Sequence, residues 1–185
     1  MSDDRRSRPD ASPAAPGDDA ALHASGMGPE EADAIVIATT TPEDTEQVAH
    51  RLGAAARSGD VIALVGPLGA GKTAFVRGLA AGLGIDPDDV ASPTFTMIAE
   101  YRGGRLALFH VDLYRLDPAD TDMLPLREYA YGAGVTAIEW FDRLPGRSLD
   151  AYVLVRIDYA EPGRLLHVSA QGARAMSLLG VLTGD

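Results

Sequence analysis

The sequence contains no cysteine and only one lysine among its 185 residues. Without cysteine, the chain has no disulfide bonds and no thiolate metal or redox centre, and we expect a cytoplasmic protein because reducing compartments suit such a composition. Arginine supplies all the other basic charge. The single lysine, Lys72, lies in a glycine-rich segment, where a compact ammonium can approach phosphates more closely than a guanidinium can.

Long apolar runs and an excess of positive charge are also missing. No run approaches the roughly 18 residues of a membrane span, and no apolar block follows the N-terminal arginines, so we expect neither a membrane span nor a secretory signal. Acidic residues number 27 against 16 basic ones, which gives a net charge of -11. Because the neutralisation of phosphates supplies most of the affinity for nucleic acids, we expect this chain not to hold one strongly by itself.

The composition divides the chain into two parts. Residues 1–33 are rich in Asp, Ala, Pro, Ser and Gly and have almost no large apolar side chain, so we expect a disordered tail. Residues 34–185 are enough for one domain with its own core. A short strand, "AIVIATT", begins this domain. A helix follows, with Thr41 as its N-cap, Pro42 in its first turn, Asp44 completing a capping box and Gly59 as its stop.

The remaining pattern alternates apolar runs with helical segments. Residues 61–66, "VIALVG", read as a central parallel strand that is buried on both faces. The next helix carries an apolar side and ends near Gly84, and a short helix is expected to start at residues 117–118. Residues 94–101 and 105–114 form one expected hairpin, "AYVLVRIDY" and "RLLHVSA" form another, and a small helix follows. The predicted fold class is α/β, with a mixed central sheet, parallel core strands, antiparallel hairpins and helices on both faces.

The segment "GPLGAGKT", residues 66–73, fits the phosphate-binding pattern G-x-x-x-x-G-K-[ST] between a strand and a helix. Glycines let the backbone wrap tightly and direct its N–H groups at phosphates, and the helix N-terminus adds its dipole. We therefore expect ATP and Mg²⁺ as ligands, with Lys72 reaching the β- and γ-phosphates and the Thr73 hydroxyl binding the metal. The predicted nucleotide-binding residues are Gly66, Gly69, Ala70, Gly71, Lys72 and Thr73.

A site of this kind needs an acid for the metal, at the end of a neighbouring strand. Asp112 ends "LALFHVD" and Glu139 ends "VTAIE", and both are candidates because the carboxyl ends of parallel strands meet at the ligand-binding edge of a sheet. His110 shares a face with Asp112 and is either its partner or a core histidine. Trp140 follows Glu139 directly, so we expect it to point to the opposite face and to pack there.

Two threonines in "SPTFT", residues 92–96, form a candidate switch. Thr94 and Thr96 follow a proline turn and could sense the γ-phosphate by becoming ordered when triphosphate and Mg²⁺ are bound. The alternative is that at least one of them simply lies in a strand, where threonine is common.

Several P-loop classes are excluded. GTPases read guanine with N-K-x-D, which cannot exist here because the one lysine is Lys72, and the L-S-G-G-Q element of transporter ATPases is absent. The segments between strands are too short for the lid and the acceptor-binding insertion of a typical small-molecule kinase. A small-metabolite kinase and a non-catalytic nucleotide-binding adaptor stay open as alternatives to an ATPase.

The motifs "GPLGAGKT", "SPTFT", "HVDLYRL" and "IEW", in this order and spacing, resemble the bacterial TsaE family over roughly residues 35–170. The resemblance implies a small P-loop ATPase required for N6-threonylcarbamoyladenosine at position 37 of tRNA. It implies that ATP binding and hydrolysis are coupled to a complex of TsaD and TsaB. tRNA would be reached only through these partners, and neither DNA nor a membrane would be a ligand.

The same resemblance assigns roles to individual residues. Lys72 and Asp112 would be catalytic, with Asp112 suited to position the attacking water, while Thr73 and Glu139 would hold Mg²⁺. Trp140 falls on a functionally important tryptophan of the family. In relatives, the segment that enters the first helix and a late turn lie by the nucleotide, and these correspond to residues 41–43 and the region near Gly163.

Overall fold

The computed structural model of this chain describes residues 34–117, 124–144 and 149–184. The tail expected over residues 1–33 and the start of a helix expected at residues 117–118 lie outside these ranges, apart from residue 117. Within the described residues, seven strands form one sheet in the order β1-β7-β6-β2-β5-β4-β3. The strands are β1 (Ile35–Thr39), β2 (Val61–Val65), β3 (Ile98–Tyr101), β4 (Ala107–Asp112), β5 (Gly134–Glu139), β6 (Tyr152–Tyr159) and β7 (Arg164–Gln171).

The centre of the sheet is parallel and its flanks are antiparallel. Strand β2 pairs in parallel with both β5 and β6, and β4 pairs in parallel with β5. Hairpins add β3 to β4 and β7 to β6, and β1 joins antiparallel to β7. Both predicted hairpins and the predicted central strand are therefore confirmed.

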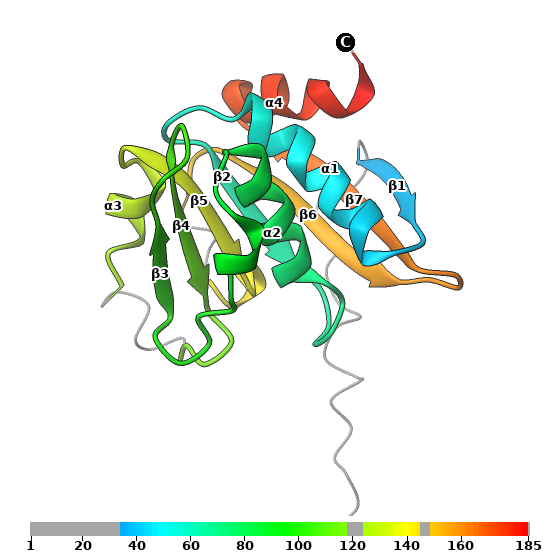
Figure 1. The fold of residues 1–185 in the computed structure, drawn as a ribbon, viewed down its shortest axis with the longest axis horizontal. Coiled ribbons are helices and arrows are strands. Elements are labelled where there is room, and N and C mark those ends of the chain that lie inside the picture. Colours follow the sequence, from blue (N-terminus) through cyan, green and yellow to red (C-terminus); the bar gives the residue numbers. More distant parts are fainter. Residues whose placement is uncertain (1–33, 118–123, 145–148, 185) are drawn as a thin grey trace, which may run out of the picture.

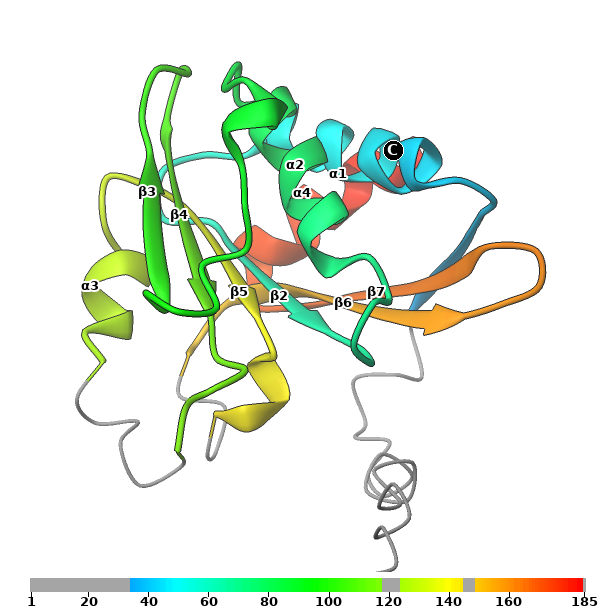
Figure 2. The same ribbon diagram turned by 60° about the horizontal axis from the view of Figure 1, so that its bottom comes forward.

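Helices cover the two faces of the sheet unequally. The helices are α1 (Pro42–Ala55), α2 (Lys72–Gly82), α3 (Leu126–Ala130) and α4 (Ala173–Thr183). Helices α1, α2 and α4 lie together over one face, and the shorter α3 lies beside β4 and β5 toward the other (Figures 1 and 2). This arrangement confirms the predicted fold class, a mixed α/β sheet with helices on both faces.

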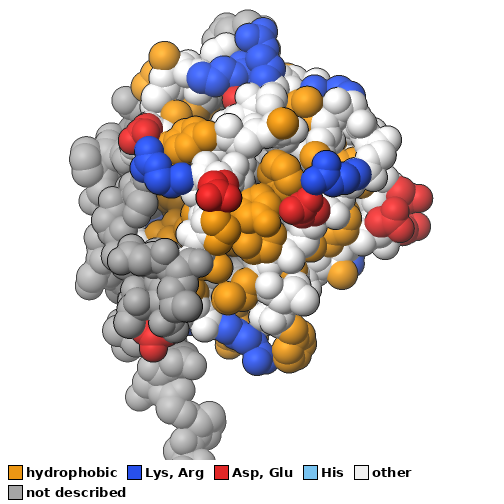
Figure 3. Space-filling view, turned by 90° about the vertical axis from the view of Figure 1, so that its left-hand side faces the viewer, with side chains coloured by type: hydrophobic (Ala, Val, Ile, Leu, Met, Phe, Trp, Pro, Cys, Tyr) orange, Lys and Arg blue, Asp and Glu red, His pale blue; other side chains and the backbone are white. Residues whose placement is uncertain are grey.

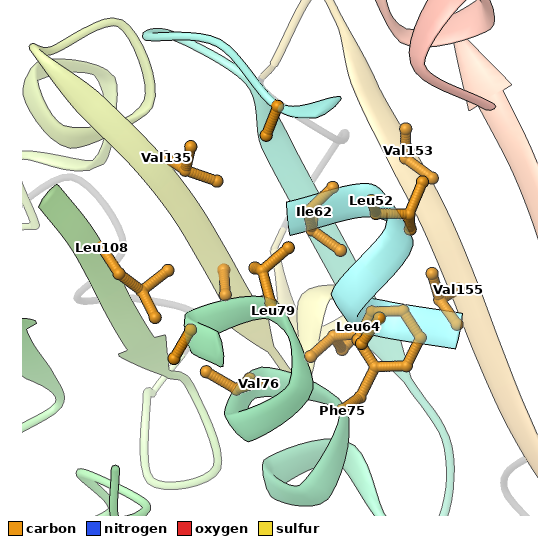
Figure 4. Packing of buried hydrophobic residues seen from close by; sticks show 14 of the residues in the cluster. Leu52, Ile62, Leu64, Phe75, Val76, Leu79, Leu108, Val135, Val153 and Val155 are labelled. Atoms are coloured by element: carbon orange, nitrogen blue, oxygen red, sulfur yellow. The ribbon is translucent and has the colours of Figure 1, made fainter. Parts of the chain in front are cut away.

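Each face of the sheet carries its own hydrophobic core. Ile62 and Leu64 of β2 point toward α1 and α2, where they pack near Leu52, Phe75 and Leu79 (Figure 4). Val61 and Ala63 alternate with them and belong to the second core, with the short helical turn Phe141–Arg143 and part of β6. Because both sides of β2 are buried, its sequence is apolar at every position rather than alternating.

Predicted boundaries are wrong for α1, β3 and β4, and β4 spans Ala107–Asp112 rather than residues 105–114. Helix α1 ends at Ala55 rather than at Gly59, because Arg105 donates hydrogen bonds to the carbonyls of Gly53 and Ala54 and so satisfies the C-terminal end early. Gly59 instead has a φ of 85° in the turn that leads into β2. Strand β3 begins at Ile98 rather than at residue 94.

The side of the molecule that carries β3 and α3 shows hydrophobic side chains gathered together, with acidic and basic side chains beside them (Figure 3). Strand β3 is an edge strand, and Glu100 within it forms an ion pair with Arg102 at 2.7 Å. Charges on an edge strand discourage pairing with another chain. Among the described residues, no helix is long and apolar enough to cross a membrane.

Candidate functional site

The loop between β2 and α2 has the backbone of a phosphate-binding loop. Gly69 and Gly71 adopt φ values of 76° and 110°, which residues with a side chain rarely adopt. Helix α2 begins at Lys72 with no side-chain hydrogen bond at its N-cap. The N-terminus of α1, by contrast, is closed by a capping box. The first amide groups of α2 are therefore left for an anion.

Lys72 lies against this loop with its ammonium enclosed. Its Nζ donates to the carbonyl oxygens of Gly66 at 2.7 Å and Pro67 at 2.9 Å, and lies 3.7 Å from the centre of the Trp140 ring. Burial lowers the pKa of Lys72, and the negative charges of Glu139, Asp142 and Asp112 act in the opposite direction. The side chain is buried, with only 5% of its surface exposed, so the charge of the ammonium acts strongly on a nearby anion.

Glu139 connects the helix with the sheet. Its Oε1 is 2.9 Å from Thr73 Oγ1, at the start of α2, and 2.9 Å from His110 Nε2, in the middle of β4. His110 is fully buried, as the core alternative predicted, and its ring is hydrogen-bonded to Glu139 rather than to Asp112. Because a carboxylate only accepts hydrogen bonds, both neighbours donate to the same oxygen.

Asp112 ends β4 directly opposite Glu139, its register partner on β5. Its Oδ2 accepts hydrogen bonds from Ser92 at 2.7 Å and from Thr94 at 2.6 Å, and its Oδ1 accepts one from the backbone N–H of Tyr114 at 2.9 Å. The two acids therefore lie side by side at the carboxyl edge of the parallel strands, where the sequence places them. Thr94 contacts the expected catalytic acid directly.

One pocket brings most of the predicted site residues together. It has a volume of about 380 Å³. Its lining includes these predicted residues: Gly69, Gly71, Lys72, Thr73, Thr94, Asp112, Glu139 and Trp140. Gly66 and Ala70 belong to the same loop but do not line this pocket, and Thr96 is exposed outside it. Neither Thr94 nor Thr96 lies in a strand, so the strand alternative for these residues is wrong.

Trp140 does not point away from Glu139, as the alternation of a strand predicts. Strand β5 ends at Glu139, and Trp140 adopts a left-handed backbone with φ 59° and ψ 41°. This turn brings the indole into the same pocket as the carboxylate, under the Lys72 ammonium. The expectation of packing is met as well, because the side chain is only 7% exposed.

A second cavity of about 170 Å³ adjoins the first. The two share Gly69, Gly71 and Ala74 of the P-loop and α2. The second one is lined from the other side by Thr41 and Pro42, at the start of α1, and by Gly163 and Arg164, in the β6–β7 hairpin. The start of α1 and the turn near Gly163, which the resemblance to relatives placed by the nucleotide, thus both lie against the P-loop.

The donor set around Thr73 and Glu139 fits Mg²⁺. The described residues contain no group of three or more His, Cys, Asp or Glu side chains that could hold a metal. Mg²⁺ does not need such a cage, because it binds through one or two protein oxygens, waters and substrate phosphates. A hydroxyl and a carboxylate 2.9 Å apart, beside a phosphate-binding loop, supply that minimal set.

Comparison with known families decides the assignment. The family profile described as "Threonylcarbamoyl adenosine biosynthesis protein TsaE" matches residues 39–166. The chain belongs to the TsaE family. The matched range contains the P-loop, both strand-end acids and the first residues of β7, so the site described above lies inside the family's common region.

Individual relatives agree with this assignment. The chain is 50% identical over 102 residues to the tRNA threonylcarbamoyladenosine biosynthesis protein TsaE of Bacillus subtilis, and the match covers 55% of this chain and 63% of that protein. It is 43% identical over 125 residues to the TsaE protein of Nostoc sp. strain PCC 7120, which covers 65% of this chain and 76% of the relative. A crystal structure of Bacillus subtilis YdiB superposes with a TM-score of 0.69 at 34% identity, over 82% of this chain and 95% of that one.

Sequence patterns did not reveal every residue at this TsaE-family site. Ser92 contacts Asp112, and Tyr159 and Arg164 contact the P-loop from the β6–β7 hairpin. Ser92 stands inside "SPTFT", so the motif could have indicated it. The resemblance indicated the region near Gly163, but no motif indicated Tyr159 or Arg164 themselves, because only the strand order brings their hairpin beside the loop.

Proposed function

We propose that this chain is the ATP-hydrolysing component of tRNA threonylcarbamoyladenosine synthesis and that it works on the TsaD–TsaB complex. The names of the family and of its relatives support the pathway. One observation supports the chemistry above all others: helix α2 presents an uncapped N-terminus and the enclosed ammonium of Lys72 to a pocket that also contains two strand-end acids.

ATP is the proposed substrate, with its triphosphate in the larger pocket. The backbone N–H groups around Gly69 and Gly71 and those at the start of α2 would bind the phosphate oxygens. Lys72 uses two of its three N–H groups on loop carbonyls, which leaves one for a phosphate. The adenosine would lie toward the second cavity, between Thr41 and Gly163.

Thr73 and Glu139 would hold Mg²⁺ beside the phosphates. When bound, the metal supplies positive charge where negative charge builds up on the phosphate oxygens. His110 orients the Glu139 carboxylate by donating to the oxygen that also accepts from Thr73. The protein groups thereby fix the position of the carboxylate before any ligand arrives.

Hydrolysis joins water to the γ-phosphorus and breaks its bond to the bridging oxygen, which yields ADP and phosphate. We assign Asp112 to orient the attacking water, since its carboxylate lines the pocket and its position is fixed by three hydrogen bonds. Two of these bonds come from Ser92 and Thr94. A rearrangement of residues 92–96 would therefore change the carboxylate that the reaction needs, which is how Thr94 would act as a switch.

The test is ATP hydrolysis by the isolated chain and by the chain with the TsaD–TsaB complex. We expect slow turnover alone and a clear increase with the complex. Lys72→Ala should abolish turnover and tRNA modification with the fold intact, and Asp112→Ala should lower turnover by about 100-fold or more. Arg102→Ala, a change of an exposed cation in the β3–β4 turn, serves as the control and should leave turnover unchanged.

Other outcomes would favour the rival functions. Transfer of the γ-phosphate to a metabolite would indicate a kinase. Full tRNA modification by Asp112→Ala and Glu139→Ala variants would indicate an adaptor that does not hydrolyse ATP. Absence of stimulation by the complex would contradict the proposed coupling.

A further inference from the structure

Five consecutive carbonyl groups of the P-loop are bonded by side chains. They belong to Gly66, Pro67, Leu68, Gly69 and Ala70. Lys72, within the motif itself, takes the first two. The other three are bonded by Tyr159 and Arg164, which end β6 and begin β7 and which the function proposed above does not use.

The contacts from the β6–β7 hairpin are direct. Tyr159 Oη donates to the carbonyl of Leu68 at 2.6 Å, Arg164 Nε donates to that of Ala70 at 3.0 Å, and Arg164 Nη2 makes a longer contact of 3.4 Å with Gly69. Tyr159 and Arg164 are register partners. The guanidinium lies 4.5 Å from the centre of the tyrosine ring, so each side chain holds the other in place.

The loop is shaped to accept this hairpin. A Cβ atom on Gly69 would lie 3.1 Å from Tyr159 Oη, closer than nine in ten real contacts of this kind. A side chain at this position would therefore push the hydroxyl away from the loop. The loop between β2 and α2 runs beside the strands of this hairpin in Figure 2.

A carbonyl and an amide group of one trans peptide unit point in opposite directions. When the hairpin holds the carbonyls of Leu68 and Ala70, the N–H groups of the same peptide units, those of Gly69 and Gly71, are held on the opposite side of the backbone. The N–H of Ala70 is bonded within the loop, to the carbonyl of Pro67 at 3.2 Å. We propose that Tyr159 and Arg164 are positioning residues that hold the P-loop in its phosphate-binding conformation. The proposal rests on the proposed function, because it assumes that the loop binds phosphates.

Tyr159→Phe is the sharpest test, since it removes only the hydroxyl. The side chain is 56% exposed, and the remaining ring can still stack on Arg164. Titration calorimetry should show ADP and pyrophosphate binding about five- to tenfold more weakly than to the wild type, as expected for one lost hydrogen bond. Binding of adenosine should be unchanged, because adenosine has no phosphate. A general loss of structure would weaken all three ligands.

Tyr131→Phe is the matched control. Tyr131 is also exposed and also uses its hydroxyl, but on Asp150 at 3.2 Å, away from the P-loop. This variant should bind ADP and pyrophosphate as the wild type does. Arg164→Lys keeps the charge and loses the planar fork of donors, so it should also weaken pyrophosphate binding.

The outcomes separate this proposal from the function on which it rests. If the wild type binds neither ADP nor pyrophosphate, the proposed function and the positioning role both fail. If the wild type binds them and both Tyr159→Phe and Arg164→Lys bind equally well, only the positioning role is overturned. Equal weakening of adenosine and pyrophosphate in Tyr159→Phe would also overturn it.

Discussion

At the scale of single residues, Glu139 depends on a buried neighbour. His110 is fully buried, its Nε2 faces Glu139 Oε1 at 2.9 Å, and its Nδ1 has no hydrogen-bond partner among the described residues. Burying a polar nitrogen without a partner is unfavourable. Among the described residues, Glu139 is the one hydrogen-bond partner of this ring, and as an acceptor it favours the tautomer with the proton on Nε2.

We predict that His110→Leu weakens the Mg²⁺-dependent part of ADP binding by about tenfold, the usual effect of losing a group that orients a metal ligand. Affinity for ADP in the presence of EDTA should stay unchanged. His110→Gln can place an amide N–H near the position of Nε2 and should restore part of the effect. Calorimetry with and without Mg²⁺ measures both quantities, and equal losses under the two conditions would show that the histidine only supports the core.

Single site residues could be predicted from the sequence where a short motif around them indicated their role. The P-loop and the two strand-end acids were recognisable because each lies inside a short motif. The orientation of Trp140 was predicted wrongly, since a left-handed turn directly after a strand reverses the alternation of side chains. The partner of His110 could not be chosen from the sequence, because Asp112 is close in sequence while Glu139 is close only across the sheet.

At the scale of elements, the capping box of α1 could be recognised from neighbouring residues, and it contains a titratable carboxyl group, that of Asp44. Asp44 accepts hydrogen bonds from the backbone N–H groups of Thr40 and Thr41 and from the Thr40 hydroxyl, and Thr41 accepts one from Asp44 N–H in return. These bonds lower the pKa of Asp44 from 3.8 to about 2, with the Thr40 hydroxyl as the largest cause. Folding therefore favours the ionised carboxylate.

We predict that Asp44→Asn lowers the melting temperature at neutral pH and that the difference from wild type shrinks in acid. The folded pKa lies below the unfolded one, so the stabilisation is fully present above a pH of 3.8 and is lost as the pH falls toward 2. Thermal melts across this range measure the effect. Asp88→Asn, in the exposed 3-10 turn Pro87–Asp89, is the control. A difference that persists unchanged below a pH of 2 would contradict the assignment.

The start of helix α1 was easier to predict than its end. The start of α1 follows from Thr41, Pro42 and Asp44, which are neighbours in sequence. Its end depends on Arg105, which reaches the last carbonyls from the β3–β4 turn, and no local pattern indicates that contact. The late start of β3 has a similar cause. Ser92 and Thr94 donate hydrogen bonds to Asp112, and these contacts keep the segment before Ile98 out of the strand.

At the scale of the whole molecule, strand order determines which segments meet at the site. The parallel strands bring Asp112 and Glu139 to one edge, a result that the fold class alone predicts. The position of the β6–β7 hairpin beside the P-loop requires the pairing of β6 with β2. Composition and periodicity predict that strand β6 exists but not which strand lies next to it. The resemblance to relatives indicated only that the region near Gly163 lies by the nucleotide, so the contacts of Tyr159 and Arg164 themselves were not predicted.

The net charge of the chain bears on how it would reach tRNA. With 27 acidic and 16 basic residues, the chain repels a polyanion at long range. Proteins that bind nucleic acids by themselves gain most of their affinity by neutralising phosphates with Lys and Arg. We therefore expect a component of tRNA modification with this charge to reach the RNA through a partner.

We predict that the isolated chain binds tRNA with a Kd weaker than about 100 μM near physiological salt, the weak limit of non-specific binding. Lowering the salt concentration should not reveal tight binding, because long-range repulsion between like charges strengthens as screening falls. Fluorescence anisotropy with labelled tRNA, with and without TsaD–TsaB, measures this directly, and the chain should join the RNA only when the complex is present. Micromolar binding by the chain alone, weakening steeply with added salt, would mean that a local basic surface overcomes the net charge and that the partner is not needed for RNA contact.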